Sequence, residues 1–116
     1  MADISVSDIL NLLSSHVKLE RDRGLLALEE KLKDTSNFTS DIRQVEDLQN
    51  SLTEFVTSTN GAWETRHGGL IGSKTFILNN LGSDDFCETL RKKSLGLMHD
   101  DEARVRIASG DLRIES

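Results

Sequence analysis

Residues 63–70 read Trp-Glu-Thr-Arg-His-Gly-Gly-Leu, and two other stretches of the chain follow the same pattern. Residues 19–26 (Leu-Glu-Arg-Asp-Arg-Gly-Leu-Leu) and 103–110 (Ala-Arg-Val-Arg-Ile-Ala-Ser-Gly) align with it without gaps, at offsets of 44 (19 to 63) and 40 (63 to 103). A small residue stands five positions after the first residue of each copy: Gly24, Gly68 and Ala108. A period of about 40–47 residues is typical of stacked helix pairs, which need a small residue where their backbones approach closely.

Helical periodicity extends over the rest of the chain. Apolar residues recur at spacings of three and four, and no segment alternates at period two as a strand would. The 116 residues include no Pro, so the commonest helix breaker is missing. The pattern predicts a single all-α domain over residues 1–116. We expect a short α-solenoid of about three antiparallel helix pairs, with approximate repeats 5–36, 38–80 and 83–116.

Three glycines interrupt the segment that begins near residue 62: Gly68, Gly69 and Gly72. Each costs about 1 kcal/mol relative to Ala in a helix interior. The close approach of a neighbouring helix is the reason we expect for keeping them. The next helix is expected to begin after Ser83, as the first does after Ser5, because serine is a favoured helix cap.

Charge and composition exclude several classes of protein. Lys and Arg number 14 against 20 Asp and Glu, a net charge of −6, which argues against a general binder of the phosphate backbone. No stretch approaches the length of apolar sequence that spans a bilayer, so no membrane segment is predicted. The N-terminus lacks the features of a secretory signal, and a single cysteine, Cys87, suits a reducing compartment. We expect a cytoplasmic or nuclear protein.

No pattern in the chain indicates catalysis, a metal or a cofactor. His16, His67 and His99 have no partner at the spacing that metal ligands require, and Cys87 has no histidine near it in sequence. Residues 68–75 read Gly-Gly-Leu-Ile-Gly-Ser-Lys-Thr, but Ser73 separates glycine from lysine and no strand precedes them, unlike a phosphate-binding loop. We therefore expect a protein that is not an enzyme and holds no cofactor and no metal.

Residues 100–108, Asp-Asp-Glu-Ala-Arg-Val-Arg-Ile-Ala, resemble the HEAT-repeat signature, in which an Asp stands five residues before a Val-Arg pair and a small residue follows. Residues 60–68 look like the same signature with Asn and Thr in place of Asp and Val. The first copy departs from it, with Asp22 at the expected Arg. In HEAT and armadillo-type proteins these polar positions form a ladder between repeats. The resemblance therefore implies a structural role for four residues: Asn60, Arg66, Asp100 and Arg106.

One copy resembles a more particular group. Residues 63–74 look like a HEAT repeat of the Mot1-type regulators of TATA-binding protein, although those are very long proteins with a motor domain that this chain lacks. The last segment is short and still apolar at its end. We therefore expect the chain to be the N-terminal part, or a shortened isoform, of a longer HEAT protein, with self-association through an uncapped last repeat as a further hypothesis.

Basic residues recur on the second segment of each predicted pair, and in a solenoid the second helices line one surface. With His67, they form the candidate partner surface: Lys18, Arg21, Arg23, His67, Lys74, Arg104 and Arg113. A solvated face is the plain interpretation of such charges. The functional interpretation is a scaffold module that binds another protein, for example an acidic peptide. The alternative is a nucleic-acid- or chromatin-associated module, although the few aromatic residues make nucleic acid a less favoured partner.

Overall fold

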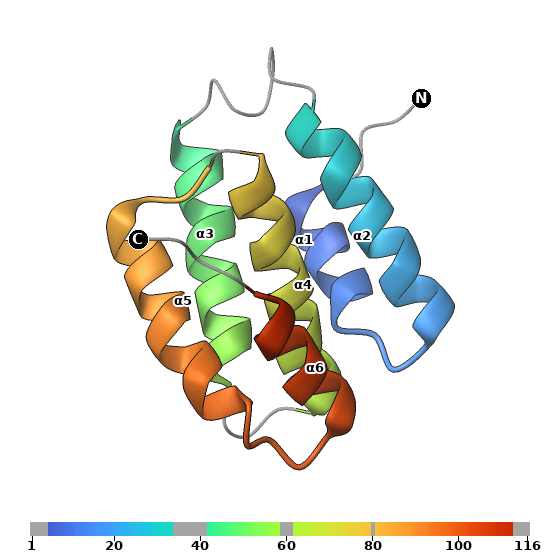
Figure 1. The fold of residues 1–116 in the computed structure, drawn as a ribbon. Coiled ribbons are helices and arrows are strands. Elements are labelled where there is room, and N and C mark those ends of the chain that lie inside the picture. The colour runs from blue at the N-terminus through green and yellow to red at the C-terminus, as the bar shows by residue number, and fades with distance from the viewer. Residues whose placement is uncertain (1–4, 34–41, 59–61, 80, 113–116) are drawn as a thin grey trace.

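The computed structural model of the chain describes residues 5–33, 42–58, 62–79 and 81–112. Within these ranges all regular structure is helical (Figure 1). The helices are α1 (Val6–Leu13), α2 (Lys18–Lys33), α3 (Ile42–Thr57), α4 (Trp63–Leu78), α5 (Asp84–Leu97) and α6 (Ala103–Asp111). The predicted all-α class is confirmed.

The starts of the helices follow from local hydrogen bonding. The Ser5 hydroxyl accepts a hydrogen bond from the Asp8 amide at 3.1 Å, and the Ser83 hydroxyl accepts one from the Phe86 amide at 3.1 Å. Each serine satisfies a backbone donor that the first turn of a helix leaves without a partner. The predicted starts after Ser5 and Ser83 are therefore confirmed.

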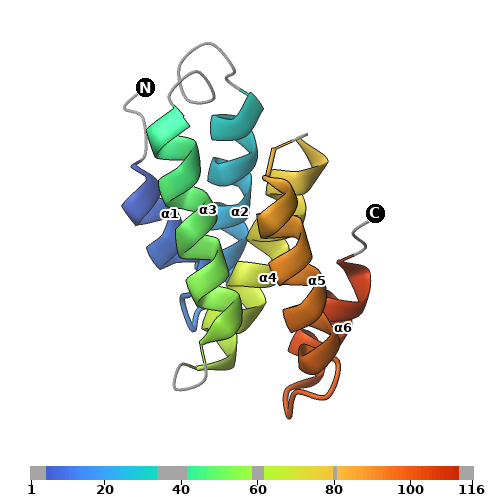
Figure 2. The same ribbon diagram turned by 90° about the vertical axis from the view of Figure 1, so that its left-hand side faces the viewer.

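Helix α4 lies in the middle of the molecule (Figures 1 and 2). Successive helices pack as pairs, α1 with α2, α3 with α4 and α5 with α6. Between the pairs, α2 contacts α4, α4 contacts α6, and α3 contacts α5. Helices α2, α4 and α6 are therefore neighbours in this order, and we call their outward sides together the second-helix face.

The glycines of α4 lie where neighbouring backbones approach most closely. A Cβ atom on Gly68 would collide with the carbonyl oxygen of Leu13 and lie 2.8 Å from its carbonyl carbon. A Cβ on Gly69 would lie 2.9 Å from the backbone nitrogen of Val56. Real Cβ atoms do not approach backbone atoms this closely, so only glycine fits at either position. The close packing of helices that we expect at these glycines is confirmed, because Gly68 lies against α1 and Gly69 lies against α3.

The core consists of aliphatic residues with two aromatic rings. Phe76 and Phe86 meet edge to face, with their ring centroids 5.5 Å apart. The other core residues come from every helix or its cap: Ile9, Leu13, Leu28, Leu32, Leu48, Leu52, Val56, Leu70, Leu90, Val105 and Leu112. Several large apolar residues of the second helices lie outside this core, among them Leu26, Leu78 and Ile107. Among the described helices, none has both the length and the apolar character that crossing a bilayer demands.

Candidate interaction surface

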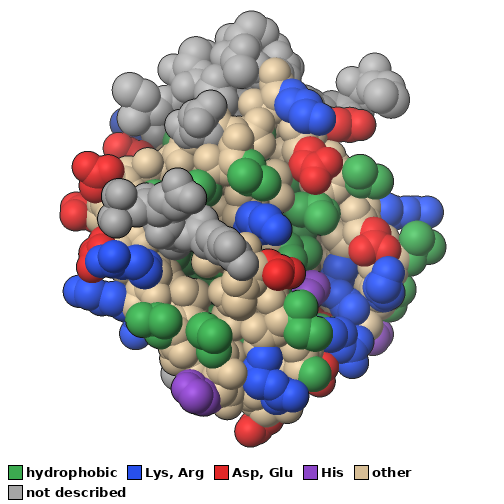
Figure 3. Space-filling model, viewed as in Figure 1, with side chains coloured by type: hydrophobic (Ala, Val, Ile, Leu, Met, Phe, Trp, Pro, Cys, Tyr) green, Lys and Arg blue, Asp and Glu red, His purple; other side chains and the backbone are tan. Residues whose placement is uncertain are grey.

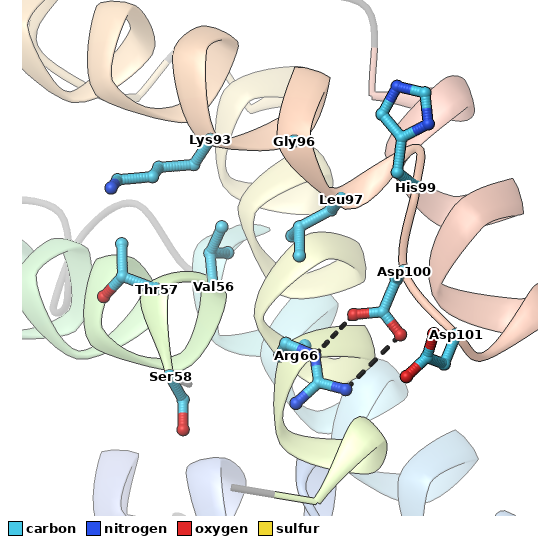
Figure 4. A pocket seen from close by; sticks show the side chains of 10 residues that line it. All are labelled: Val56, Thr57, Ser58, Arg66, Lys93, Gly96, Leu97, His99, Asp100 and Asp101. Carbon is cyan, nitrogen blue, oxygen red and sulfur yellow. Dashed lines mark hydrogen bonds and ion pairs between the residues drawn. The ribbon is translucent and has the colours of Figure 1, made fainter. Parts of the chain in front are cut away.

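An ion pair joins α4 to the turn before α6. The Nε of Arg66 donates to Oδ2 of Asp100 at 2.8 Å, and Nη2 donates to Oδ1 at 3.3 Å (Figure 4). The two side chains are 17% and 9% exposed. Burial raises the pKa of Asp100, but hydrogen bonds from Arg66 and from the Glu102 amide outweigh it and hold that pKa below its usual value. Two of the predicted structural residues therefore contact each other between the second and third helix pairs.

The Arg106 side chain binds the backbone of the same turn. Its Nη1 donates to the carbonyl oxygens of Asp100, at 2.6 Å, and Asp101, at 3.1 Å. Arg21 makes the equivalent contact in the first helix pair, where its Nη1 donates at 2.9 Å to the carbonyl of Ser15. Both arginines reach a carbonyl six residues earlier in the chain. Asn60, the fourth predicted structural residue, lies outside the described residues.

The first repeat is aligned one residue out of register when the copies are matched without gaps. That alignment places Asp22 opposite Arg66 and Arg106, whereas Arg21 makes the equivalent contact. The starts of the helices give the reason. Arg66 and Arg106 stand three residues after the first residues of α4 and α6, and Arg21 stands three residues after Lys18, where α2 begins. The first helix pair therefore has an arginine that makes this contact, one position earlier than the gapless alignment places it.

A pocket of about 440 Å³ lies beside this ion pair (Figure 4). Its walls come from the end of α3, the start of α4, the end of α5 and the turn that follows, with Thr57, Lys93 and His99 among the lining residues. Arg66 and Asp100 form one wall, where each offsets the charge of the other. A pocket whose wall charges are balanced internally offers little net attraction to a charged ligand.

A cluster of cations surrounds Trp63 where the second helices begin. The guanidinium carbon of Arg104 lies 4.1 Å from the centroid of the Trp63 ring, and that of Arg21 lies 4.9 Å from it. Arg21 is 5% exposed, and Arg104 is held by an ion pair from its Nε to Glu102 Oε1 at 2.9 Å. Arginine over an indole face is favourable because the ring presents negative charge density. We call Arg21, Trp63 and Arg104 the Arg–Trp–Arg cluster.

His67 belongs to the same cluster of side chains. Its ring meets Trp63 edge to face, with centroids 5.9 Å apart, and its Nδ1 is buried without a hydrogen-bond partner in the described structure. Burial lowers the pKa of His67, and the charges of Arg21 and Arg104 lower it further, against a smaller opposing effect from Glu102. Both effects disfavour the charged form of the imidazole.

This lowered pKa predicts a loss of stability in mild acid. Between the ordinary histidine pKa of 6.5 and the lower folded value, the unfolded chain takes up a proton that the folded chain does not. Stability should therefore fall as the pH drops from about 7.5 to about 5.5. Chemical unfolding at both pH values tests this. His67→Phe, which keeps a ring beside Trp63 but cannot titrate, should show a smaller change, and an equal change in both proteins would contradict the assignment to His67.

A groove between α4 and α6 leads away from the cluster. Its first part, of about 200 Å³, is lined by His67, Leu70, Ile71, Lys74, Arg104, Ile107, Ala108 and Asp111. A second hollow of about 340 Å³ shares Lys74 and Asp111 with it and adds Ile77, Leu78 and Leu112. Ile107 is 64% exposed and Leu78 is 71% exposed along this path. We call the two hollows together the α4–α6 groove.

The structure brings together part of the predicted partner surface. Arg21, His67 and Arg104 meet at Trp63, and Lys74 continues the line along the groove. Figure 3 shows Lys and Arg side chains gathered between α6 and α2, with a histidine among them. The other predicted residues contribute less: Lys18 is exposed and pairs with Asp22 at 3.1 Å, Arg23 is exposed, and Arg113 lies outside the described residues.

Trp63 is a functional candidate that the sequence pattern did not single out. It is the single tryptophan of the chain and the first residue of the stretch 63–70, and these two features could have identified it.

Within the described residues, no group of His, Cys, Asp or Glu side chains is arranged to hold a metal ion. Compared with models of protein families, with curated proteins and with solved structures, the chain matches none.

Proposed function

We propose that the chain is a non-enzymatic, HEAT-type helical-repeat module that binds an acidic segment of another protein along its second-helix face. One observation carries this proposal. Arg21 of α2, His67 of α4 and Arg104 of α6 converge on Trp63, although the chain as a whole has a net charge of −6. A local basic cluster on an acidic chain is complementary to an acidic partner.

The HEAT-type arrangement is supported by features that recur from pair to pair. The second helices α2, α4 and α6 are neighbours in chain order, as stacked repeats require. Arg21 and Arg106 make the same backbone contact at the start of their helices. The ion pair between Arg66 and Asp100 joins one repeat to the next, as the ladder of the resembled family would.

The groove supplies the chemistry that an acidic, partly apolar segment needs. Arg104 is positioned in advance by the Trp63 ring and by Glu102, so less side-chain freedom is lost when it pairs with a carboxylate. Lys74 provides a second cation further along the groove. Ile107 and Leu78 are exposed apolar side chains along the groove. They suit leucine or phenylalanine side chains of the partner.

Nucleic acid is the less favoured partner, for a structural reason. Base stacking needs an open aromatic face, and two guanidinium groups already lie over the Trp63 ring. Binding of an oligothymidylate probe, with affinity falling steeply as salt rises, would support the nucleic-acid alternative instead. Binding of an acidic apolar peptide should depend on salt more weakly, because apolar burial contributes to it.

Removing Arg104 should weaken binding of such a peptide. The probe is a synthetic peptide in which glutamates are interspersed with leucines, labelled with a fluorophore and followed by anisotropy. Arg104→Ala is expected to lower the affinity about tenfold, because a charge-assisted pair beside the Trp63 ring is lost. Lys92→Ala is the matched control, since Lys92 is an exposed cation of α5, outside the second-helix face, and its loss should leave the affinity unchanged. Equal losses in the two variants, or no binding by the wild-type chain, would overturn the proposal.

A further inference from the structure

The position of His67 adds a property that charge complementarity alone does not. Its ring lies at the mouth of the α4–α6 groove, between the Arg–Trp–Arg cluster and Lys74. The Nδ1 atom is buried and has no partner in the described structure. A neutral imidazole tolerates an unpaired acceptor there. Protonation would place a donor without an acceptor, and a new charge, beside two guanidinium groups.

The charged groups around His67 come from the helices packed against α4. Arg21 approaches from α2 and Arg104 from α6, and both oppose a positive charge on the ring. Glu102, the cap of α6, favours that charge, but its carboxylate is already paired with Arg104. Among the described residues, no charged side chain of α1 or α3 lines the hollow beside His67. Lys74 and Asp111 also line the hollow beside His67, one cation and one carboxylate. At the ring itself, the two guanidinium groups therefore face one carboxylate, Glu102, which is already paired.

We infer that His67 couples partner binding to proton uptake: an acidic segment that docks at Arg104 supplies the negative charge that allows His67 to take a proton from solvent. This inference rests on the proposed function. A carboxylate beside Arg104 reduces the net positive charge at the ring, so the imidazolium forms more readily in the complex than in the free chain. By linkage, the affinity for an acidic segment then rises as the pH falls through the histidine range.

The test compares the affinity of the labelled glutamate–leucine peptide at about pH 7.5 and about pH 6, where its glutamates stay largely ionised. The wild-type chain is expected to bind at least about twofold more tightly at the lower pH. His67→Gln is expected to bind with the same affinity at both pH values. A direct measurement that needs no variant is the NMR titration of the imidazole resonances with and without saturating peptide. The His67 titration should move to higher pH on binding.

The outcomes separate this inference from the function on which it rests. If the peptide binds, but equally at both pH values and with an unmoved His67 titration, proton coupling is wrong and the interaction surface stands. An equal pH effect in wild type and His67→Gln would assign the protons to other groups, and it too would overturn the coupling. Failure of the peptide to bind at either pH would overturn both.

Discussion

Gly68→Ala should lower the free energy of unfolding by about 3 kcal/mol, because the new methyl group has no space to occupy. Its Cβ would collide with the carbonyl oxygen of Leu13 in α1. Neither backbone can move without separating α1 from α4, which packs against both neighbouring second helices as well. In a domain of this size the melting temperature should fall by roughly 10 °C, measurable by circular dichroism.

Gly110→Ala is the matched control for that substitution. Gly110 is also in a second helix, α6, and a Cβ atom there would meet nothing within 4 Å. The intrinsic preference of helices for Ala should leave this variant unchanged, or more stable by up to about 1 kcal/mol. If Gly68→Ala were as stable as Gly110→Ala, the close approach of α1 and α4 would be wrong.

Breaking the ion pair between Arg66 and Asp100 should cost about 2 kcal/mol, the second large effect. Both side chains are mostly buried, so each partner left alone keeps a charge away from water. Arg66→Ala and Asp100→Ala should therefore destabilise the chain by similar amounts, and the double variant by less than their sum. Urea unfolding of the four proteins gives the coupling free energy. Because the pKa of Asp100 is lowered in the folded chain, the contribution of the ion pair to stability should persist above about pH 4. It should disappear as acid protonates the carboxylate.

The pair between Lys18 and Asp22 provides the comparison. Its side chains are 79% and 55% exposed, and exposed pairs contribute little because water screens them. A cycle on these two residues should give a coupling of about 0.5 kcal/mol or less. Additive losses at Arg66 and Asp100, with a coupling no larger than that of the exposed pair, would contradict a structural role for the buried pair.

Local features of the fold were predictable because their causes are local. The helix starts after Ser5 and Ser83 depend on one hydroxyl and an amide three residues later. The glycines of α4 indicated close packing because glycine in a helix interior needs a reason. The resemblance to HEAT repeats suggested structural roles for Arg66 and Asp100, which lie 34 residues apart, and the structure places them in contact.

The candidate site was predictable only in part, because tertiary contacts assemble it. The spacing of basic residues on the second helices indicated a ridge that includes Arg21 and Arg104. It gave no sign that both guanidinium groups lie over Trp63, since that geometry depends on how α2 and α6 pack against α4. The register of the first repeat failed for a related reason: the loop before Lys18 differs in length from the others, and a gapless alignment does not follow it.

The most direct test of the proposed interaction surface uses the single tryptophan as a reporter. Trp63 contributes the only indole N–H resonance of the chain, and it lies at the centre of the Arg–Trp–Arg cluster. We predict that titration with the glutamate–leucine peptide shifts this resonance together with backbone amides of α4 and α6 along the groove. Shifts confined to the pocket beside the Arg66–Asp100 ion pair, near Lys93 and His99, with the Trp63 resonance unmoved at saturation, would contradict the account.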